Sequence, residues 1–329
     1  MAKYNKNYKP KSAEERKKEI DDAMQLIEQG VIDFLTSDKY ISFLKSMSKF
    51  HNYSFNNTIL ILSQCPTATH VASFPAWKRD FNRYVTSGSK GIKILVPVEY
   101  KIYKNKVDPE TNEVLLDKDG EPIKEYSGEK GLAYKIGNVF DVQQTQQIEG
   151  KEVIPLDLEV KELTDSVNDY SNLLNAIINT APVPVVFGEC PRGAKGYFSP
   201  VENKIVIQDG LSELHTLKTA IHETAHAILH NTENLKKLKS ENIELNSSDK
   251  ETQAESVAFI VSYHYGLDTS DYSFPYVATW AGEVTRISAN MKYISEAASQ
   301  IIDTMDKQLE LVLDKDEQIE EISGDEIEI

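Results

Sequence analysis

The chain has 329 residues, of which 40% are hydrophobic and 27% charged, the balance of a soluble globular protein that can bury a core. This length exceeds one ordinary domain and suits two. The longest apolar stretches, residues 58–62 and 92–98, are too short to span a membrane, and residues 1–18 do not resemble a secretion signal. The two cysteines, Cys65 and Cys190, exclude a disulfide framework and a four-cysteine zinc site. We therefore expect a cytoplasmic protein without membrane association.

Charge is divided unevenly along the chain. The net charge is -16, from 36 Lys and Arg against 52 Asp and Glu. Residues 1–104 hold 17 basic and 10 acidic residues, a net charge of +7, whereas residues 105–329 hold 19 and 42, a net charge of -23. This division predicts two parts with different partners, of which only the first suits a nucleic acid. The alternative is that charges on solvated surfaces simply vary along the chain.

The sequence of the first third of the chain predicts helices followed by a strand. Residues 1–12 are polar and rich in lysine, which predicts a loose basic arm. The run Ser12-Ala-Glu-Glu has the form of a capping box and predicts the start of a helix. Apolar residues at helical spacing predict two further helices at residues 40–50 and 55–63. A strand is expected at residues 91–98, after a glycine-containing turn.

The remainder alternates between strands, loops and helices. Residues 105–130 have the composition of an exposed hairpin or loop, and residues 149–160 are the best linker candidate. Residues 314–329 are strongly acidic and predict a disordered tail. The other predicted elements are strands at residues 134–142, 183–187 and 204–207 and helices at residues 163–180, 212–230, 250–265 and 276–313.

One motif carries specific chemistry. His222-Glu-Thr-Ala-His226 matches the H-E-x-x-H pattern. On a helix, His222 and His226 lie one turn apart and can bind one zinc ion (Zn2+). Glu223 is offset by about 100°, where it can act as general base toward a water that the metal polarises. The pattern therefore predicts a catalytic zinc site with Glu223 as its base.

A catalytic zinc ion usually needs a third protein ligand. The next predicted helix offers Glu251 and Glu255, which share one face because they are four residues apart. We favour Glu251 as the ligand and Glu255 as the group that orients a ligating histidine, with the reverse assignment left open. The alternative is that both are solvated surface acids.

Four other residues near the motif are candidates for smaller roles. His230 could support the site, although a histidine at the helix end or on the surface is the commoner case. His215 and His264 lie nearby in the sequence without an assigned role. Tyr197 could donate a hydrogen bond to an oxyanion, with ordinary packing as the alternative.

The first part also carries a cluster of cations among aromatic residues. Phosphate-binding cations and aromatic faces for unstacked bases are what single-stranded nucleic-acid binding uses. An alternative for Trp77 and Phe81 is that they form the buried face of a helix. The candidate DNA-binding residues are Lys78, Arg79, Arg83, Tyr84, Lys90 and Lys93.

These motifs resemble two known families. The C-terminal part resembles the ImmA/IrrE-type zinc metallopeptidase domain, and the N-terminal part resembles the first domain of ArdC-type antirestriction proteins and LtrC-like proteins of plasmids and conjugative elements. The C-terminal resemblance rests on Gly196-Tyr-Phe-Ser-Pro-x-x-x-Lys-Ile-Val-Ile, His222-Glu-Thr-Ala-His226 and Glu251-x-x-Ala-Glu255-x-x-Ala258. The N-terminal resemblance rests on Tyr53-Ser-Phe-Asn-Asn57, Leu62-x-Gln64, Val71-Ala72 with Trp77, Gly88-Ser-Lys-Gly-Ile92 with Pro97, and Phe140-Asp-Val-x-Gln-Thr145.

The resemblance implies an α+β fold of two domains. An α+β single-stranded-DNA-binding domain would occupy residues 13–148, and a gluzincin-like α+β metallopeptidase domain would occupy residues 161–313. In one respect the chain departs from the pattern. Many ImmA-like domains carry Glu-Ala-Asn on the helix of the third ligand, whereas this chain has Gln253-Ala-Glu255, which leaves the choice between the two glutamates open.

The resemblance also implies a function, and two alternative functions stay open. The leading hypothesis is a mobile-element protein that binds single-stranded DNA, carries a zinc metallopeptidase domain with an unknown protein or peptide substrate, and protects incoming DNA by antirestriction. The alternative is a non-enzymatic antirestriction protein with a structural or vestigial zinc site, against which the intact Glu223 argues. A third possibility is a regulatory peptidase that cuts a repressor.

Overall fold

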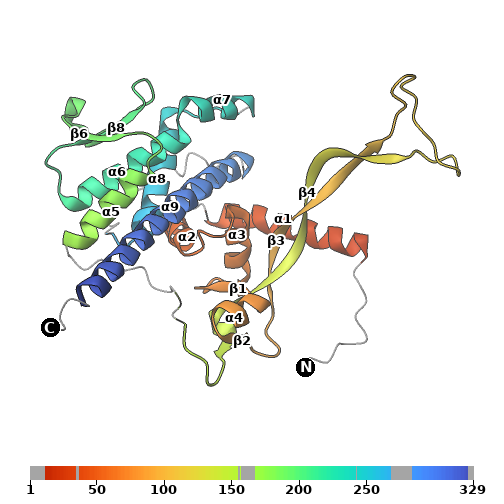
Figure 1. The fold of residues 1–329 in the computed structure, drawn as a ribbon, viewed down its shortest axis with the longest axis horizontal. Coiled ribbons are helices and arrows are strands. Elements are labelled where there is room, and N and C mark those ends of the chain that lie inside the picture. Colours follow the sequence, from red (N-terminus) through yellow and green to blue (C-terminus); the bar gives the residue numbers. More distant parts are fainter. Residues whose placement is uncertain are drawn as a thin grey trace.

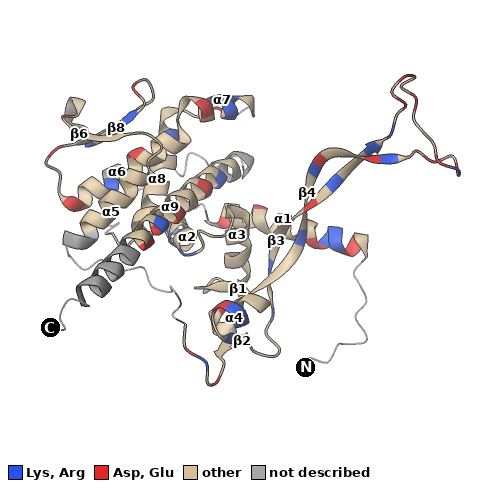
Figure 2. Ribbon diagram, viewed as in Figure 1, with Lys and Arg blue, Asp and Glu red and all other residues tan. Residues whose placement is uncertain are grey.

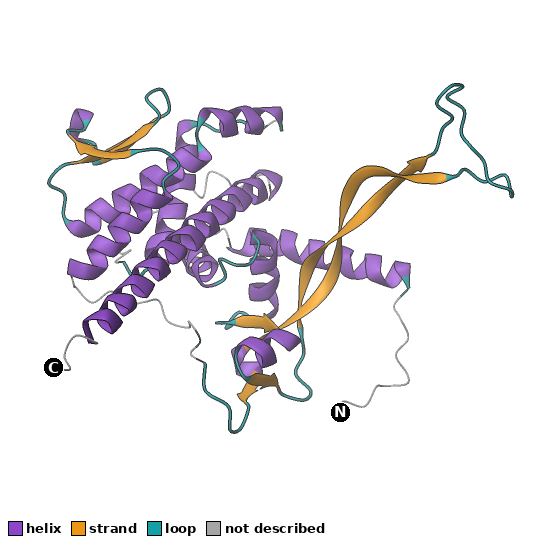
Figure 3. Ribbon diagram, in the orientation of Figure 1, coloured by secondary structure: helices purple, strands orange, loops and turns teal. Residues whose placement is uncertain are grey.

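The structure is a computed structural model that describes residues 12–34, 37–154, 156, 167–241, 243–267 and 284–324. It has a mixed α+β fold, as expected, in which helices form the main body and one long β-ribbon projects from it (Figure 1, Figure 3). Most of the predicted basic arm, the end of the predicted linker and the start of the helix expected at residues 276–313 lie outside the described residues.

Within its described residues, the N-terminal part combines four α-helices with two small antiparallel sheets. One sheet has the strand order β1-β4-β3, and the other pairs β2 with β5. Its elements are α1 (Ala13–Phe34), α2 (Ser37–Lys49), α3 (Phe55–Gln64), β1 (Val71–Ser73), α4 (Phe74–Asp80), β2 (Arg83–Val85), β3 (Ile92–Asn105), β4 (Lys124–Asp141), η1 (Val142–Gln144) and β5 (Thr145–Gln147).

As far as it is described, the C-terminal part places five α-helices beside a three-stranded sheet of order β6-β8-β7. Strand β8 is parallel to β6 and antiparallel to β7. Its elements are α5 (Val167–Thr180), β6 (Val185–Gly188), η2 (Pro191–Gly193), β7 (Gly196–Ser199), β8 (Lys204–Gln208), α6 (Glu213–Leu229), α7 (Thr232–Ser240), α8 (Ser247–His264) and α9 (Val284–Gly324).

The predicted capping box is confirmed at the start of α1. The Ser12 backbone N–H donates to the Glu15 carboxylate at 2.7 Å, and the Glu15 N–H donates to the Ser12 hydroxyl at 3.1 Å. This pair satisfies two amides that a helix start otherwise leaves without partners. The predicted exposed excursion is the outer half of the β3–β4 ribbon, whose tip contains two isolated bridges and several turn hydrogen bonds.

Side-chain amides of α3 complete the free edge of β3. Asn57 donates to the Leu95 carbonyl at 2.9 Å and accepts from the Leu95 N–H at 2.8 Å. Gln64 makes the same pair of bonds with Lys93, at 2.8 and 3.0 Å. Two amide side chains therefore replace a neighbouring strand, and they protect an edge that is otherwise open to pairing with another chain.

A second group of bonds fixes the start of the sheet. The buried Asp141 carboxylate accepts from the N–H groups of Thr69, His70 and Gln143. Trp77 is fully buried, and its indole N–H donates to the Phe140 carbonyl at 2.9 Å. The core interpretation of Trp77 is therefore the correct one, and this ring cannot stack on a base.

The helices of the N-terminal part pack directly on those of the C-terminal part. Helix α2 contacts α8, and α8 contacts α9 (Figure 1). The fully buried Tyr40 hydroxyl on α2 lies 2.8 Å from the Ser256 hydroxyl on α8 and 3.7 Å from the Met291 sulfur on α9. One continuous set of buried hydrophobic residues runs through both parts. The division into domains at residues 13–148 and 161–313 stays a prediction.

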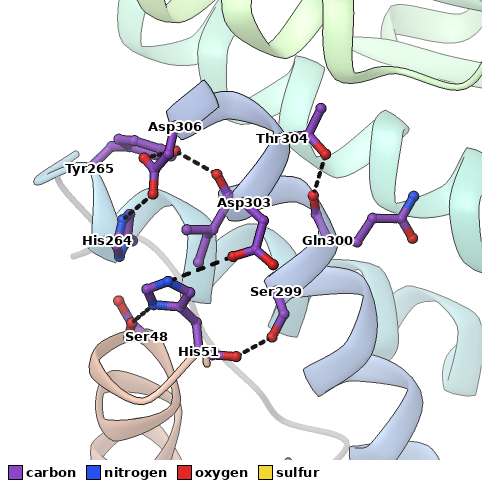
Figure 4. Close-up of polar contacts among 10 residues, drawn as sticks. Ser48, His51, His264, Tyr265, Ser299, Gln300, Asp303, Thr304 and Asp306 are labelled. Carbon is purple, nitrogen blue, oxygen red and sulfur yellow. Dashed lines mark hydrogen bonds and ion pairs between the residues drawn. The ribbon is translucent and has the colours of Figure 1, made fainter. Parts of the chain in front are cut away.

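A polar cluster reinforces this junction just beyond the end of α2 (Figure 4). The His51 ring meets the His264 ring edge to face, with centroids 5.0 Å apart. Asp303 on α9 lies 3.8 Å from His51, and the Tyr265 hydroxyl donates to Asp306 at 2.8 Å. Burial lowers the pKa of His51, so these contacts act mainly as hydrogen-bonding and packing contacts at neutral pH.

Some features of the fold differ from the sequence predictions. Helix α9 continues through Gly324, so the prediction of disorder is wrong for residues 314–324, in which no Pro occurs and the one Gly comes at the end. Helix α7 and the short strands β1, β2, β5 and β7 were not predicted, and α4 was expected only as the alternative for Trp77 and Phe81. Among the described residues, no helix has the length and apolar character that crossing a bilayer requires.

The edge bonds of β3 predict a stability change. Asn57→Ala removes both bonds to Leu95 and leaves two backbone groups without partners, so we expect a loss of about 1–3 kcal/mol in the free energy of unfolding. Chemical denaturation of the full chain measures this loss. Asn56→Ala is the matched control, and an equal loss in both variants contradicts the role of Asn57.

Candidate metal centre

Helix α6 carries the H-E-x-x-H motif in a rigid setting. It begins after Ser212, whose hydroxyl accepts from the His215 N–H at 3.4 Å, and no Gly or Pro interrupts it. One side of the helix is buried in the core. The buried apolar residues of this helix are Leu217, Ala220, Ile221, Ala225, Ala227 and Leu229. Because the helix is fixed along its length, its metal-facing side chains have defined positions.

Helix α8 supplies the opposing carboxylates. It begins with a capping box in which Asn246 and Asp249 bond reciprocally, at 2.9 and 3.1 Å. Its apolar residues are buried against α6, α2 and α9. The two helices therefore hold their facing turns at a fixed separation, and side chains at residues 222, 226 and 251 meet between them.

Three side chains form a set that could hold a metal ion. The Nε2 atoms of His222 and His226 are 3.1 Å apart. The two carboxylate oxygens of Glu251 lie 3.5 Å from His222 Nε2 and 3.4 Å from His226 Nε2. Each residue offers one ligand atom within 4.8 Å of the others, and no other such group of His, Cys, Asp or Glu occurs among the described residues. The structure thus brings together the three residues that the sequence suggested.

The two glutamates occupy different positions in this set. Glu251 contacts both imidazoles at Nε2, whereas Glu255 contacts only the other ring nitrogen of His222, with 3.1 Å from Oε2 to Nδ1. A carboxylate at Nδ1 fixes the imidazole so that Nε2 faces the metal position. The Glu251 side chain is 63% exposed, so its proximity to the histidines, not burial, is what marks it as a ligand candidate.

Electrostatics in the metal-free site follow from these contacts. Burial lowers the pKa of His222, but the bonds to Glu251 and Glu255 and the charge of Glu223 outweigh burial and raise it to about 10. The close contacts with both imidazoles hold the pKa of Glu251 far below its usual range. In the absence of metal, a proton on His222 therefore balances part of the carboxylate charge, and a metal ion would replace it.

Glu223 has the environment of a proton acceptor. It is buried beside the histidines, and burial raises its pKa, although the two imidazoles and a hydrogen bond from the Phe198 backbone oppose that rise. A carboxylate with a raised pKa binds a proton more readily at neutral pH. The Phe198 N–H also fixes the direction in which the carboxylate points.

Strand β7 forms one wall of a cleft beside this site. A side chain at Gly196 would place its Cβ 2.5 Å from the Thr219 methyl group and 3.3 Å from Glu223 Cγ, so only glycine allows the strand to approach α6 this closely. The cleft has a volume of about 270 Å³. Its lining residues are Lys195, Gly196, His215, Lys218, Thr219, His222, Glu223 and Glu255.

The other residues singled out near the motif have different positions. Tyr197 does not line the cleft, which favours its packing interpretation. His215 does line it, with its ring 2.8 Å from the Ser212 hydroxyl. His264 belongs to the distant cluster with His51. His230 ends α6, as a helix-end histidine should, but it is buried and its Nδ1 lies 2.8 Å from His226 Nδ1.

The candidate DNA-binding residues lie on α4, on β2 and around the start of β3 (Figure 2). Three of the cations have partners within the chain. Arg79 bonds to Asp80 at 2.6 and 2.7 Å, Arg83 bonds to Thr145, and Lys93 lies 3.1 Å from Glu19. The remaining residues of the set, Lys78, Tyr84 and Lys90, are exposed.

Comparisons with known proteins find a family model that matches the N-terminal part. Residues 13–140 match the model of the N-terminal domain of the anti-restriction factor ArdC. Over 355 aligned residues the chain is 28% identical to the uncharacterized protein pXO2-81 of Bacillus anthracis. That alignment covers 98% of this chain but 57% of the relative. The chain therefore spans little more than half the length of this curated relative.

Two solved structures of the antirestriction protein ArdC from the R388 plasmid are also similar, each with 16% sequence identity. The metal-free structure has a TM-score of 0.44 and covers 78% of this chain and 85% of its own. The Mn(II)-bound structure has a TM-score of 0.45 and covers 86% and 97%. The family match thus covers residues 13–140, which are similar to the N-terminal domain of ArdC.

Proposed function

We propose that this chain is an antirestriction-type protein that holds a divalent metal ion in a peptidase-like site and binds single-stranded DNA through its N-terminal part. The observation that carries the metal proposal is the spacing of the three ligand atoms of His222, His226 and Glu251. The antirestriction setting rests on the family of the N-terminal domain.

The donor set fits zinc. Two atoms that each lie about 2.0–2.1 Å from one zinc ion at the tetrahedral angle are about 3.3–3.4 Å apart. The two histidine nitrogens are 3.1 Å apart, and Glu251 approaches them with one oxygen 3.4 Å from His226 Nε2 and the other 3.5 Å from His222 Nε2. Two imidazoles and one carboxylate with a fourth position open to the cleft are the ligand set of catalytic zinc, although manganese accepts the same donor types.

In the proposed hydrolysis, each residue near the metal position has its own role. A bound zinc ion supplies Lewis-acid polarisation of a carbonyl group and a water molecule. Glu223 can accept a proton from that water and return it to a leaving amine, which makes it the general base and acid. Glu255 orients His222 from its Nδ1 side.

The wall of the cleft suits a peptide substrate. Strand β7 pairs with β8 on one side only and is therefore an edge of its sheet. An extended peptide can add to such an edge through backbone hydrogen bonds, which recognise main chain without regard to sequence. The start of β7 borders the cleft at Gly196, so a chain bound there would pass next to Glu223.

The ligand assignment predicts an order of metal loss. Purified wild-type protein should contain about one zinc ion per chain by elemental analysis, and His222→Ala should lose it. Glu251→Ala should lower zinc affinity more than Glu255→Ala, for which a ten- to hundredfold loss is about what removal of an orienting partner costs. The reverse order would reassign the third ligand to Glu255.

The base assignment predicts a separation of binding from hydrolysis. Glu223→Gln should retain zinc, because Glu223 is not among the three ligands, and should lose peptide-bond cleavage of recipient-cell proteins by a factor of about 100 or more. The assay compares wild type and variant with single-stranded DNA present. If the variant keeps zinc and full antirestriction activity, the site is not catalytic in this function and the non-enzymatic alternative is correct.

The DNA proposal is supported by charge and by exposed aromatic residues. Residues 1–104 have a net charge of +7 within an otherwise acidic chain. The β3–β4 ribbon adds a surface that sequence reasoning missed, on which Lys101 lies over the Tyr126 ring at 5.5 Å and Tyr126 contacts Tyr103. The exposed tyrosines of the ribbon are Tyr100, Tyr103, Tyr126 and Tyr134. Such rings can stack on unpaired bases while lysines contact phosphates.

The partners of the cations within the chain predict which cations contribute to DNA affinity. In the full-length chain, replacing both Lys78 and Lys90 with Gln should weaken binding to a single-stranded oligonucleotide severalfold and reduce its dependence on salt concentration. Arg79→Gln is the control and should have a smaller effect, because Asp80 already neutralises that guanidinium. Fluorescence anisotropy across a salt series measures both quantities. The DNA proposal is contradicted if the affinity of the wild type does not change with salt concentration, or if the wild type binds only duplex DNA.

A further inference from the structure

A buried chain of hydrogen bonds leads away from the candidate metal site. His226 Nδ1 lies 2.8 Å from His230 Nδ1, and His230 Nε2 lies 2.8 Å from the Gln253 side-chain oxygen. The Gln253 amide N–H donates to the Asn290 side-chain oxygen at 2.6 Å. His230, Gln253 and Asn290 are all buried, and they come from the end of α6, from α8 and from α9. We call these three side chains the relay.

The chemistry of the relay sets the direction of each bond. The Gln253 oxygen can only accept, so His230 must carry its proton on Nε2. A neutral His230 with a proton on Nε2 has a lone pair on Nδ1, so His226 must donate from its own Nδ1. A neutral His226 with its proton on Nδ1 has its lone pair on Nε2, the atom that faces His222 and Glu251.

The opposite direction is incompatible with metal binding. If the Gln253 amide were turned over, its N–H would donate to His230 Nε2, His230 would donate to His226 Nδ1, and a neutral His226 would carry its proton on Nε2. That proton would occupy the position that a ligand atom must leave free. The orientation of one amide on α8 therefore decides whether His226 is ready to bind a metal.

We propose that His230, Gln253 and Asn290 are positioning residues that hold His226 in the tautomer and orientation needed to ligate the metal, with Asn290 of α9 fixing the orientation of the Gln253 amide. This inference rests on the proposed metal site. His222 has a corresponding partner in Glu255, so each ligating histidine has its Nδ1 engaged by the chain. A carboxylate orients one imidazole, and a neutral relay orients the other.

An unpaired atom supports a functional origin for the relay. Asn290 is 1% exposed, and its side-chain N–H group has no hydrogen-bond partner among the described residues. An unpaired buried donor costs about 1–3 kcal/mol, which an apolar residue at this position would avoid. The cost is offset if the oxygen of Asn290 is needed to orient Gln253. Asn290 thus lowers the stability of the fold but sets the direction of the hydrogen bonds in the relay.

Zinc affinity of the full-length chain tests the relay. Competition with a chromophoric chelator should show a ten- to hundredfold loss in Gln253→Leu and His230→Leu, which remove the bonds while keeping apolar volume. Gln253→Glu should retain affinity, because its carboxylate still accepts from His230. His230→Gln should also retain most of it, because its amide accepts from His226 and donates to Gln253. Thr224→Val is the control, since it removes from the same helix a buried hydroxyl that has no partner in the part of the chain that the structure describes.

A second measurement does not depend on bound metal. The ¹⁵N imidazole shifts of the metal-free chain should show His230 as a neutral ring protonated on Nε2, and Asn290→Leu should abolish this preference. If wild type takes up zinc but the Leu variants bind it as tightly, or if His230 is protonated on Nδ1, the relay proposal is overturned. If wild type takes up no zinc, the proposed metal site itself fails, and the imidazole shifts still decide the direction of the relay. Thermal unfolding of each variant separates loss of fold from loss of affinity.

Discussion

The approach of α6 to α8 is the constraint on which the rest of the candidate site depends. Two imidazole nitrogens lie 3.1 Å apart, and a carboxylate lies within 3.5 Å of both. Such a group of side chains needs a positive charge among them. Without a cation between them, the site must hold a proton, as the raised pKa of His222 indicates. The cores of both helices hold these groups together, so the metal ligands are preorganised before any ion arrives. Gly196 serves the same constraint from the other side, because it lets β7 reach α6.

The local part of this site could be predicted from sequence, and the reason is helical geometry. The four-residue spacing of His222 and His226 and of Glu251 and Glu255 fixes which side chains share a face. Spacing could not reveal the relay, because Gln253 and Asn290 lie 23 and 60 residues beyond His230 in the sequence. Such partners are decided by how three helices pack, which a single sequence does not encode in any short pattern.

The N-terminal part shows the same limit in charge and in strand pairing. A cluster of cations was visible in the sequence, but their pairing was not: Glu19 reaches Lys93 from a helix 74 residues away. The motif residues Asn57 and Gln64 were visible as a resemblance, whereas their physical task, capping the edge of β3, emerges only from the fold. The helical residues 314–324 were misjudged for a different reason, since acidity was weighed above helix propensity.

The contact between α2 and α8 changes how the two proposed activities should be studied. Tyr40 from the N-terminal part is fully buried between Ser256 and Met291, and α8 also carries Glu251. A fragment that ends near residue 150 would expose this tyrosine and the apolar side of α2 to water, at a cost of a few kcal/mol for each large side chain. Loss of DNA binding in such a fragment would then report on a damaged core, not on the DNA surface. Because one buried core runs through the described helices of both parts, a change in α2 also acts on the helix that positions the third metal ligand. Binding of DNA and of metal are therefore properties to be measured on the whole chain, with point substitutions as the means of separating them.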